Sequence, residues 1–279
     1  MSSFENHRNP FEAYSGANRM ANLNVFIPVL VITVLMSLVI IKTGIIGSIG
    51  IVGMFFAIAL IYMIFKNPKS GIILLIILGF FVTGIARYVP APWGLSIDGL
   101  LILIYLALFF KGFANKIPWS KAKSPLTLVV TIWMGYILLQ IGNPEAQSIE
   151  AWFYAMRGVA LYQWLSIPLL FILFNQSKDL NTFFIVWGIL SVIGTLKGFQ
   201  QFHFGVDPFE QRWLDQGGAE THILFGKLRV FSFYSDAGQF GASQGHAGVV
   251  FGILALFKKG NSKLKSFFAF VALAGFFGM

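Results

Sequence analysis

The sequence has no cysteine and few charged residues. Its 279 residues therefore contain no thiol for a disulfide, a thiolate nucleophile or a cysteine-ligated metal. Charged residues make up 11% of the chain, against about 25% in soluble domains. The GxSxG, Walker and GxGxxG patterns of hydrolases and nucleotide-binding proteins do not occur in a usable context. These absences exclude thiol chemistry and give no support to a nucleotide or serine-hydrolase site.

Apolar residues dominate the chain instead. They make up 57% of it, with 31 phenylalanines, and their runs reach the roughly 17 to 25 residues that a helix needs to cross a bilayer. We therefore predict an all-α, polytopic membrane bundle with about nine spans, the last of them incomplete. The predicted spans are Val25 to Ile41, Ile45 to Phe65, Ile72 to Ala86, Ile97 to Phe113, Leu126 to Gly142, Gly158 to Phe174, Thr182 to Phe199, Gln239 to Phe257, and Phe267 onward.

Both ends of the chain bear on this span count. Residues 1–24 are polar and lack the apolar core and cleavage site of a signal peptide. We predict a cytoplasmic N-terminal segment there and a transmembrane domain over residues 25–279. The last apolar run, Phe267 to Met279, is too short to cross a bilayer unaided. We therefore expect the natural chain to continue beyond Met279.

Basic residues are distributed unevenly among the predicted loops. With the N-terminus inside, 13 of the 20 lysines and arginines fall in inner segments and seven at outer segments and mouths, whereas eight of the 11 carboxylates lie outside. The positive-inside rule therefore predicts a multi-pass protein with a cytoplasmic N-terminus. Nucleic-acid binding has little support, because the basic residues are divided among short inner loops.

One stretch is too polar to cross a bilayer. Residues 200–246 hold five of the 11 carboxylates, three of the four histidines and three basic residues, and unpaired charge is costly in hydrocarbon. We predict a long outer loop over about residues 200–238, between the seventh and eighth spans. Its histidines are far apart in sequence, unlike those of helical zinc motifs, so we predict no metal site.

Several charged residues lie at the predicted outer mouths of the spans. Arg157 opens the sixth span, and its planar, permanently charged guanidinium suits a phosphate or a carboxylate. Snorkelling, or pairing with Glu150, is the alternative. For Arg87 we expect a partner in Asp98, and for Lys197 we expect snorkelling to the outer interface.

Arg229 stands immediately before an aromatic run that leads back into the membrane. Tyr234, Asp236 and Gln239 follow it, so that basic, aromatic, acidic and amide side chains converge at one outer mouth. Proteins commonly hold sugars in this way, with ring faces on aromatics and hydroxyls on amides and carboxylates. An interfacial belt of aromatic residues is the alternative.

The segment Arg229 to Gly241, RVFSFYSDAGQFG, resembles the central signature of the O-antigen ligase and O-antigen polymerase superfamily. That signature places an arginine before a glycine, a phenylalanine, Asn-Pro-Asn, a Phe or Leu, and a small residue. The corresponding positions here are Arg229, Ser232, Tyr234, Asp236-Ala237-Gly238, Phe240 and Gly241. Arg157, 72 residues before Arg229, resembles the upstream arginine of the family.

The resemblance implies an integral enzyme of the bacterial inner membrane, of the metal-independent, inverting type and without a cofactor. Such an enzyme transfers a glycan from an undecaprenyl pyrophosphate carrier to an acceptor sugar of a glycan or glycolipid on the periplasmic side. Arg157 and Arg229 would then hold the pyrophosphate, and the sugar side would be lined by Tyr234, Asp236 and Gln239. The catalytic histidine of the family would lie in a loop beyond Met279.

Two hypotheses from other classes stay open beside the enzyme. A transporter of a lipid-linked or anionic solute would place ionisable residues or broken helices near the midplane, whereas the charges here gather at the outer mouths. A non-catalytic membrane subunit is favoured if Met279 is the natural end. The sequence does not distinguish ligation from polymerisation.

Overall fold

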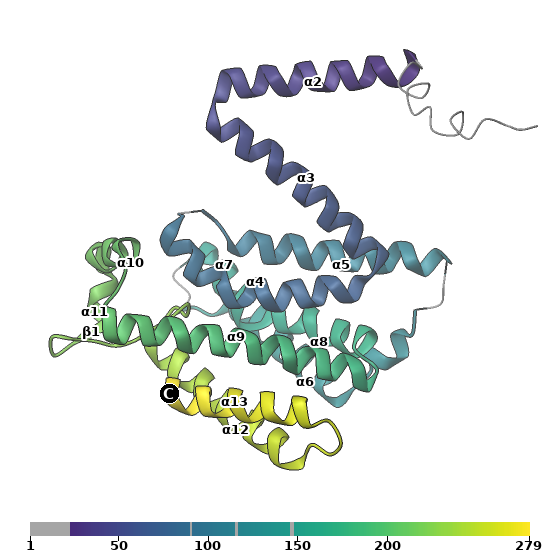
Figure 1. Cartoon of the computed structure of the whole chain (residues 1–279). Coiled ribbons are helices and arrows are strands. Elements are labelled where there is room, and N and C mark those ends of the chain that lie inside the picture. The colour runs from purple at the N-terminus through teal and green to yellow at the C-terminus, as the bar shows by residue number, and fades with distance from the viewer. Residues whose placement is uncertain (1–22, 90, 115–116, 146–147) are drawn as a thin grey trace, which may run out of the picture. The chain divides into compact units, whose positions relative to one another are not determined.

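A computed structural model describes residues 23–89, 91–114, 117–145 and 148–279 (Figure 1). The predicted N-terminal segment, residues 1–24, lies outside the described residues except for its last two. Helices account for most of the described chain, which establishes the all-α class. The elements are α2 (Leu23–Thr43), α3 (Ile45–Lys66), α4 (Pro68–Tyr88), α5 (Gly94–Ala114), η2 (Trp119–Ala122), α6 (Pro125–Leu139), η3 (Gln140–Gly142), α7 (Ile149–Met156), η4 (Arg157–Leu161), α8 (Tyr162–Leu173), α9 (Ser177–Phe204), α10 (Pro208–Trp213), η5 (Leu214–Gly218), α11 (Ala219–His222), β1 (Ile223–Leu224), β2 (Lys227–Leu228), α12 (Ala237–Phe257) and α13 (Ser262–Gly278).

Eight helical stretches among the described residues are long and apolar enough to cross a membrane. They are α2, α3, α4, α5, α6 with η3, the continuous run α7–η4–α8, α9 and α12. The structure thus supports a polytopic helical membrane protein. The incomplete ninth span is predicted where α13 lies, which has 17 residues. It begins five residues before the predicted Phe267, because the Asn261 side chain accepts a hydrogen bond from the N–H of Leu264 and caps the helix.

The chain divides into two compact units, Met1–Tyr62 and Met63–Met279, which are described separately. In the first unit, α2 and most of α3 are separated by Gly44, whose φ of +61° makes the turn between them. None of the residues in Phe26–Thr43 is buried. Helices that expose apolar side chains on every face need lipid around them.

In the second unit, contacts between helix ends follow the predicted alternation of inner and outer loops. The start of α4 meets the start of α9 through an ion pair of 2.7 Å between Lys69 and Asp179. At the same end, Lys258 after α12 donates to Asn181 over 3.0 Å. Arg87, near the opposite end of α4, contacts the segment that precedes α12. Residues predicted on one side of the membrane thus gather at one end of the helices.

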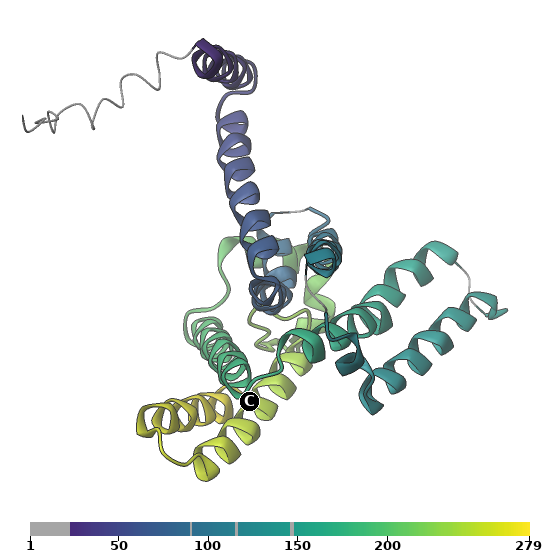
Figure 2. The same cartoon turned by 90° about the vertical axis from the view of Figure 1, so that its right-hand side faces the viewer.

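A cluster of buried apolar side chains lies between α12 and α13. Helix α9 packs against these two helices (Figure 2). The cluster contains Phe251, Phe268 and Val271, each less than 2% exposed. Small residues bring these helices together: a Cβ placed on Gly275 of α13 would lie 2.7 Å from the backbone nitrogen of Gly248 in α12. Such backbone contact is how helices associate where lipid weakens the hydrophobic drive.

Replacing Gly275 by alanine should separate α12 from α13. The new Cβ would meet backbone atoms, which cannot move aside as a flexible side chain does, so we expect a loss of about 1–3 kcal/mol in stability. Thermal unfolding in detergent measures the effect. Gly252→Ala is the control, because a Cβ there meets only Ala272 at 3.9 Å. Equal shifts in the two variants would contradict the close-contact explanation.

Candidate functional site

The segment between β2 and α12 is fixed by an unusual serine. Ser232 has a φ of +50°, a left-handed conformation that is rare outside glycine. Each of its polar groups is bound: its N–H donates to Gln201 over 2.7 Å, its hydroxyl to the Gly194 carbonyl over 2.7 Å, and its carbonyl accepts from Arg87 over 2.8 Å. Helices α4 and α9 thus hold this segment, residues 229–236, in one place.

Arg87 reaches this segment from the last turn of α4. Its guanidinium also donates to the Tyr234 carbonyl, and it lies 4.6 Å from the Trp213 ring centre and 4.3 Å from that of Phe231. The expected pair with Asp98 is therefore wrong. Among the described residues, no carboxylate lies within ion-pair distance of Arg87. Its charge is stabilised by two carbonyls and two aromatic faces instead.

A buried polar network joins the end of α9 to α10. The Lys197 ammonium lies 3.0 Å from Asp207 and 3.1 Å from Glu210, and its side chain is only 14% exposed. The expectation that Lys197 snorkels is thus wrong, because two carboxylates hold it. Glu210 also accepts from Gln201 over 2.8 Å, and Tyr88 donates to Asp207. Since Gln201 binds Ser232 as well, the network extends to the 229–236 segment.

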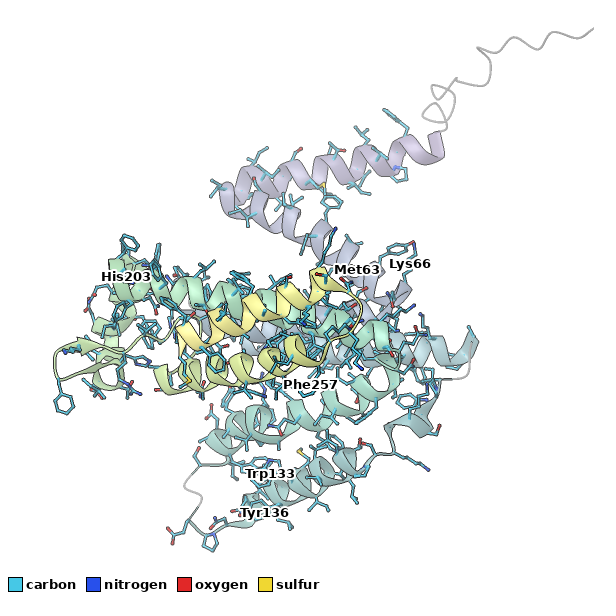
Figure 3. The ribbon with its side chains drawn as sticks, turned by 60° about the horizontal axis from the view of Figure 1, so that its bottom comes forward. Met63, Lys66, Trp133, Tyr136, His203 and Phe257 are labelled. Atoms are coloured by element: carbon cyan, nitrogen blue, oxygen red, sulfur yellow. The ribbon has the colours of Figure 1, made fainter. Side chains whose placement is uncertain are left out.

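A cavity of about 510 Å³ opens between α9, α12 and α13 at the same end of the bundle. In Figure 3, His203 marks this end and Phe257 the opposite end of the three helices. The walls are mostly apolar, and two of the lining side chains, Phe202 and Phe277, are 72% and 69% exposed. Arg229 and His203 are the cationic or titratable side chains among the described lining residues. The cavity therefore combines apolar walls with a permanent cation. The lining comprises Thr195, Gly198, Phe199, Phe202, His203, Arg229, Val230, Ala237, Phe240, Gly241, Phe277, Gly278 and Met279.

The other residues predicted on the sugar side lie next to this cavity rather than in its lining. Asp236 caps α12 by accepting from the N–H groups of Gly238 over 2.6 Å and Gln239 over 3.3 Å. These two hydrogen bonds and the charge of Arg229 lower the pKa of Asp236. The Tyr234 hydroxyl bonds to Ser243 over 2.7 Å, and burial raises its pKa. Gln239 is exposed and accepts from the Ser235 hydroxyl.

Arg157 lies at the start of a π-helical turn, η4, that joins α7 to α8. Its guanidinium pairs with Asp98 of α5, and its side chain is 10% exposed. Glu150, the partner considered from the sequence, does not form an ion pair with it among the described residues. Arg157 is absent from the cavity lining. The two arginines expected to hold one pyrophosphate thus do not line a common cavity.

Sequence reasoning missed several buried polar residues. Gln201, Glu210 and Gln244 are each 1% exposed or less. A signal for Glu210 was present, because Asp207-Pro-Phe-Glu210 has the spacing of a capping box, and both hydrogen bonds of that box are formed. Gln244 gave no signal, since its partners in α9 lie about 50 residues earlier in the chain. No group of three His, Asp or Glu side chains suited to a metal occurs in the described part of the chain.

Comparison with known protein families, curated proteins and solved structures finds no match to this chain.

Breaking the Asp98–Arg157 pair should destabilise the bundle. Asp98→Asn leaves a largely buried guanidinium without its counter-charge, so we expect a loss of up to about 3 kcal/mol. Glu150→Gln removes the same charge from an exposed position on α7 and should change stability little. Thermal unfolding in detergent compares the two variants. A larger effect of Glu150→Gln would mean that the pair is wrongly assigned.

The Asp207 carboxylate should make the polar network between α9 and α10 sensitive to acid. Burial raises the pKa of Asp207, but hydrogen bonds from Tyr88, the N–H of Glu210 and Lys197 outweigh it and lower the pKa to about 2. Because the folded-state pKa lies below the unfolded value of about 3.9, the stabilisation is complete above pH about 4 and is lost as the pH falls towards 2. Asp207→Asn should make the melting temperature less dependent on pH between pH 4 and 2. An unchanged slope would contradict this origin.

Proposed function

We propose that this chain is a membrane enzyme that transfers a glycan from an undecaprenyl pyrophosphate carrier to an acceptor sugar. In this proposal it is an O-antigen ligase-like or polymerase-like protein of the bacterial inner membrane. Its N-terminus lies in the cytoplasm, and the end of the bundle that holds the cavity faces the periplasm. The observation that carries the proposal is the placement of Arg229 in the lining of an apolar cavity between three membrane helices.

The cavity suits an amphiphile with an anionic head. Its volume lies within the roughly 300–1,000 Å³ of small-molecule sites. The exposure of Phe202 and Phe277 gives the apolar walls contact with surrounding lipid, from which an isoprenoid chain enters. A guanidinium is the side chain best matched to phosphate oxygens. Arg229 has open capacity for such a ligand, because its one side-chain hydrogen bond to protein is a 3.3 Å contact with the Thr221 carbonyl, counted over the described residues.

In this proposal the two arginines, Arg229 and Arg157, have different roles. The pyrophosphate is assigned to Arg229, while Arg157 supports the fold, because Asp98 already occupies its guanidinium. Tyr234, Asp236 and Gln239 stay on the sugar side, since the first two follow Arg229 in the segment that leads into α12 and Gln239 lies in the first turn of that helix. Groups that donate hydrogen bonds to a departing phosphate favour its release. His203, which lines the cavity with Arg229, takes the second position.

A transporter gains no comparable support. Near the middle of α9 and α12, the hydroxyls of the buried residues Ser191 and Thr195 donate to the side-chain carbonyl of buried Gln244 over 2.9 and 3.1 Å. The Gln244 amide also donates to the Ser191 carbonyl over 3.2 Å. A cluster whose hydrogen bonds are already made ties helices together and does not offer a solute site.

Arg229→Ala should strongly reduce transfer from an undecaprenyl-pyrophosphate-linked glycan by the protein in proteoliposomes. Loss of one charge-assisted hydrogen bond costs about 1.5–3 kcal/mol, so donor binding should weaken roughly 10- to 100-fold. Arg212→Ala is the matched control, because Arg212 is exposed on α10 and lies outside the cavity.

Retained transfer by Arg229→Ala would overturn the assignment of the pyrophosphate. Saturable counterflow of the lipid-linked glycan, without transfer, would favour the transporter instead. Equal losses in Arg229→Ala and Arg212→Ala would point to a general effect of surface charge on donor binding.

A further inference from the structure

Arg87 lies on α4, which does not line the cavity, yet it binds the segment that carries Arg229. It is a permanent cation near the end of a membrane helix, and among the described residues both of its hydrogen bonds go to main-chain carbonyls of one short segment, at Ser232 and Tyr234. A guanidinium can span two carbonyls and stack on rings at the same time, which an ammonium cannot do. The arrangement therefore uses properties specific to arginine.

Further contacts with α4 also fix the segment that Arg87 binds. Besides Ser232, the Phe233 carbonyl accepts a hydrogen bond of 2.6 Å from Thr83, one turn before Arg87 on α4. A Cβ on Gly84 would lie 2.8 Å from the Phe233 ring, so the ring sits directly against the helix. Three consecutive carbonyls, at residues 232 to 234, are thus fixed by α4.

Arg229 stands three residues before the first of these carbonyls. Its own N–H donates to the His222 carbonyl over 2.8 Å, which ties it to the β1–β2 hairpin. Beside the hairpin, the rings of Trp213, His222 and Phe231 pack together, with centres 4.9 to 5.4 Å apart. The guanidinium of Arg87 lies over two of those three rings. The Arg87 side chain thus contacts both the ring cluster beside the hairpin, which precedes Arg229, and the carbonyls of residues 232 and 234, which follow it.

We propose that Arg87 is the positioning residue of this site: it holds the 229–236 segment against α4 so that the Arg229 guanidinium faces the cavity. This inference rests on the proposed function for its ligand, an amphiphile with a phosphate head. The effect of Arg87 on the position of Arg229 does not depend on that ligand.

The first test is a double-mutant cycle in the full-length protein, with undecaprenyl pyrophosphate as the probe. Arg87→Lys keeps the charge but loses the fork, and it should weaken binding about three- to tenfold. In the Arg229→Ala background the same change should have no further effect, because Arg87 acts through Arg229. Arg212→Lys, the same substitution at an exposed arginine, should leave binding unchanged. Equal losses in both backgrounds would overturn the proposal.

The second test needs no ligand. Because the chain has no cysteine, Arg229→Cys introduces a single thiol, whose rate of modification by a charged methanethiosulfonate reports its exposure. Adding Arg87→Lys should change that rate several-fold, whereas a thiol from Phe225→Cys, at the fully exposed hairpin tip, should react at the same rate in both backgrounds. An unchanged rate at position 229 would overturn the positioning role.

The two tests separate this inference from the proposed function. If Arg229→Ala binds the probe normally, the proposed function fails, and the thiol rates still decide whether Arg87 positions the segment. If Arg87→Lys does not fold, Thr83→Val removes the neighbouring hydrogen bond to the Phe233 carbonyl and carries the same expectations for probe binding and thiol rate.

Discussion

The hydrogen bonding of Ser232 is the constraint on which the rest of the cavity end of the bundle depends. A left-handed backbone at a non-glycine residue persists only when its surroundings overdetermine it. Here α9 supplies an acceptor for the hydroxyl and, through Gln201, one for the N–H, while α4 supplies a donor for the carbonyl. The chain therefore returns from the hairpin to α12 along one path. That path sets which residues meet the cavity.

Charges at this end fall into two groups with different physical roles. Lys197, Glu210 and the Asp98–Arg157 pair have partners that compensate them, so they contribute to holding helices together. Arg229 and His203 face open volume instead. An arginine that borders apolar space without an ion-pair partner is costly unless a ligand or water meets it. The difference in partners, and not the number of charges, separates structural arginines from the candidate binding residue.

The fold was largely predictable from the sequence, because runs of apolar residues have few ways to satisfy their backbone in lipid. The alternation of loop charges likewise placed Lys69 and Asp179 at one end. The ion-pair partners of the buried charges were not predictable. From the sequence, Asp98 is expected to pair with Arg87, because both flank one short turn. In the structure Asp98 pairs with Arg157, which lies 59 residues further along the chain. Which arginine meets which carboxylate depends on how helices rotate about their axes, and that rotation is set by contacts such as Gly248 on Gly275, which no periodicity reveals.

The length of α9 couples the cavity to the surrounding bilayer. At 28 residues it measures about 42 Å, well beyond a hydrocarbon thickness of about 30 Å, so the helix must tilt or project. Its last turns carry Phe199, Phe202 and His203, which line the cavity. In a thicker membrane α9 stands more upright and these residues move towards the acyl chains; in a thinner one they rise into the headgroups. Lipid composition thereby becomes a determinant of how deeply the cavity and Arg229 lie relative to the headgroups.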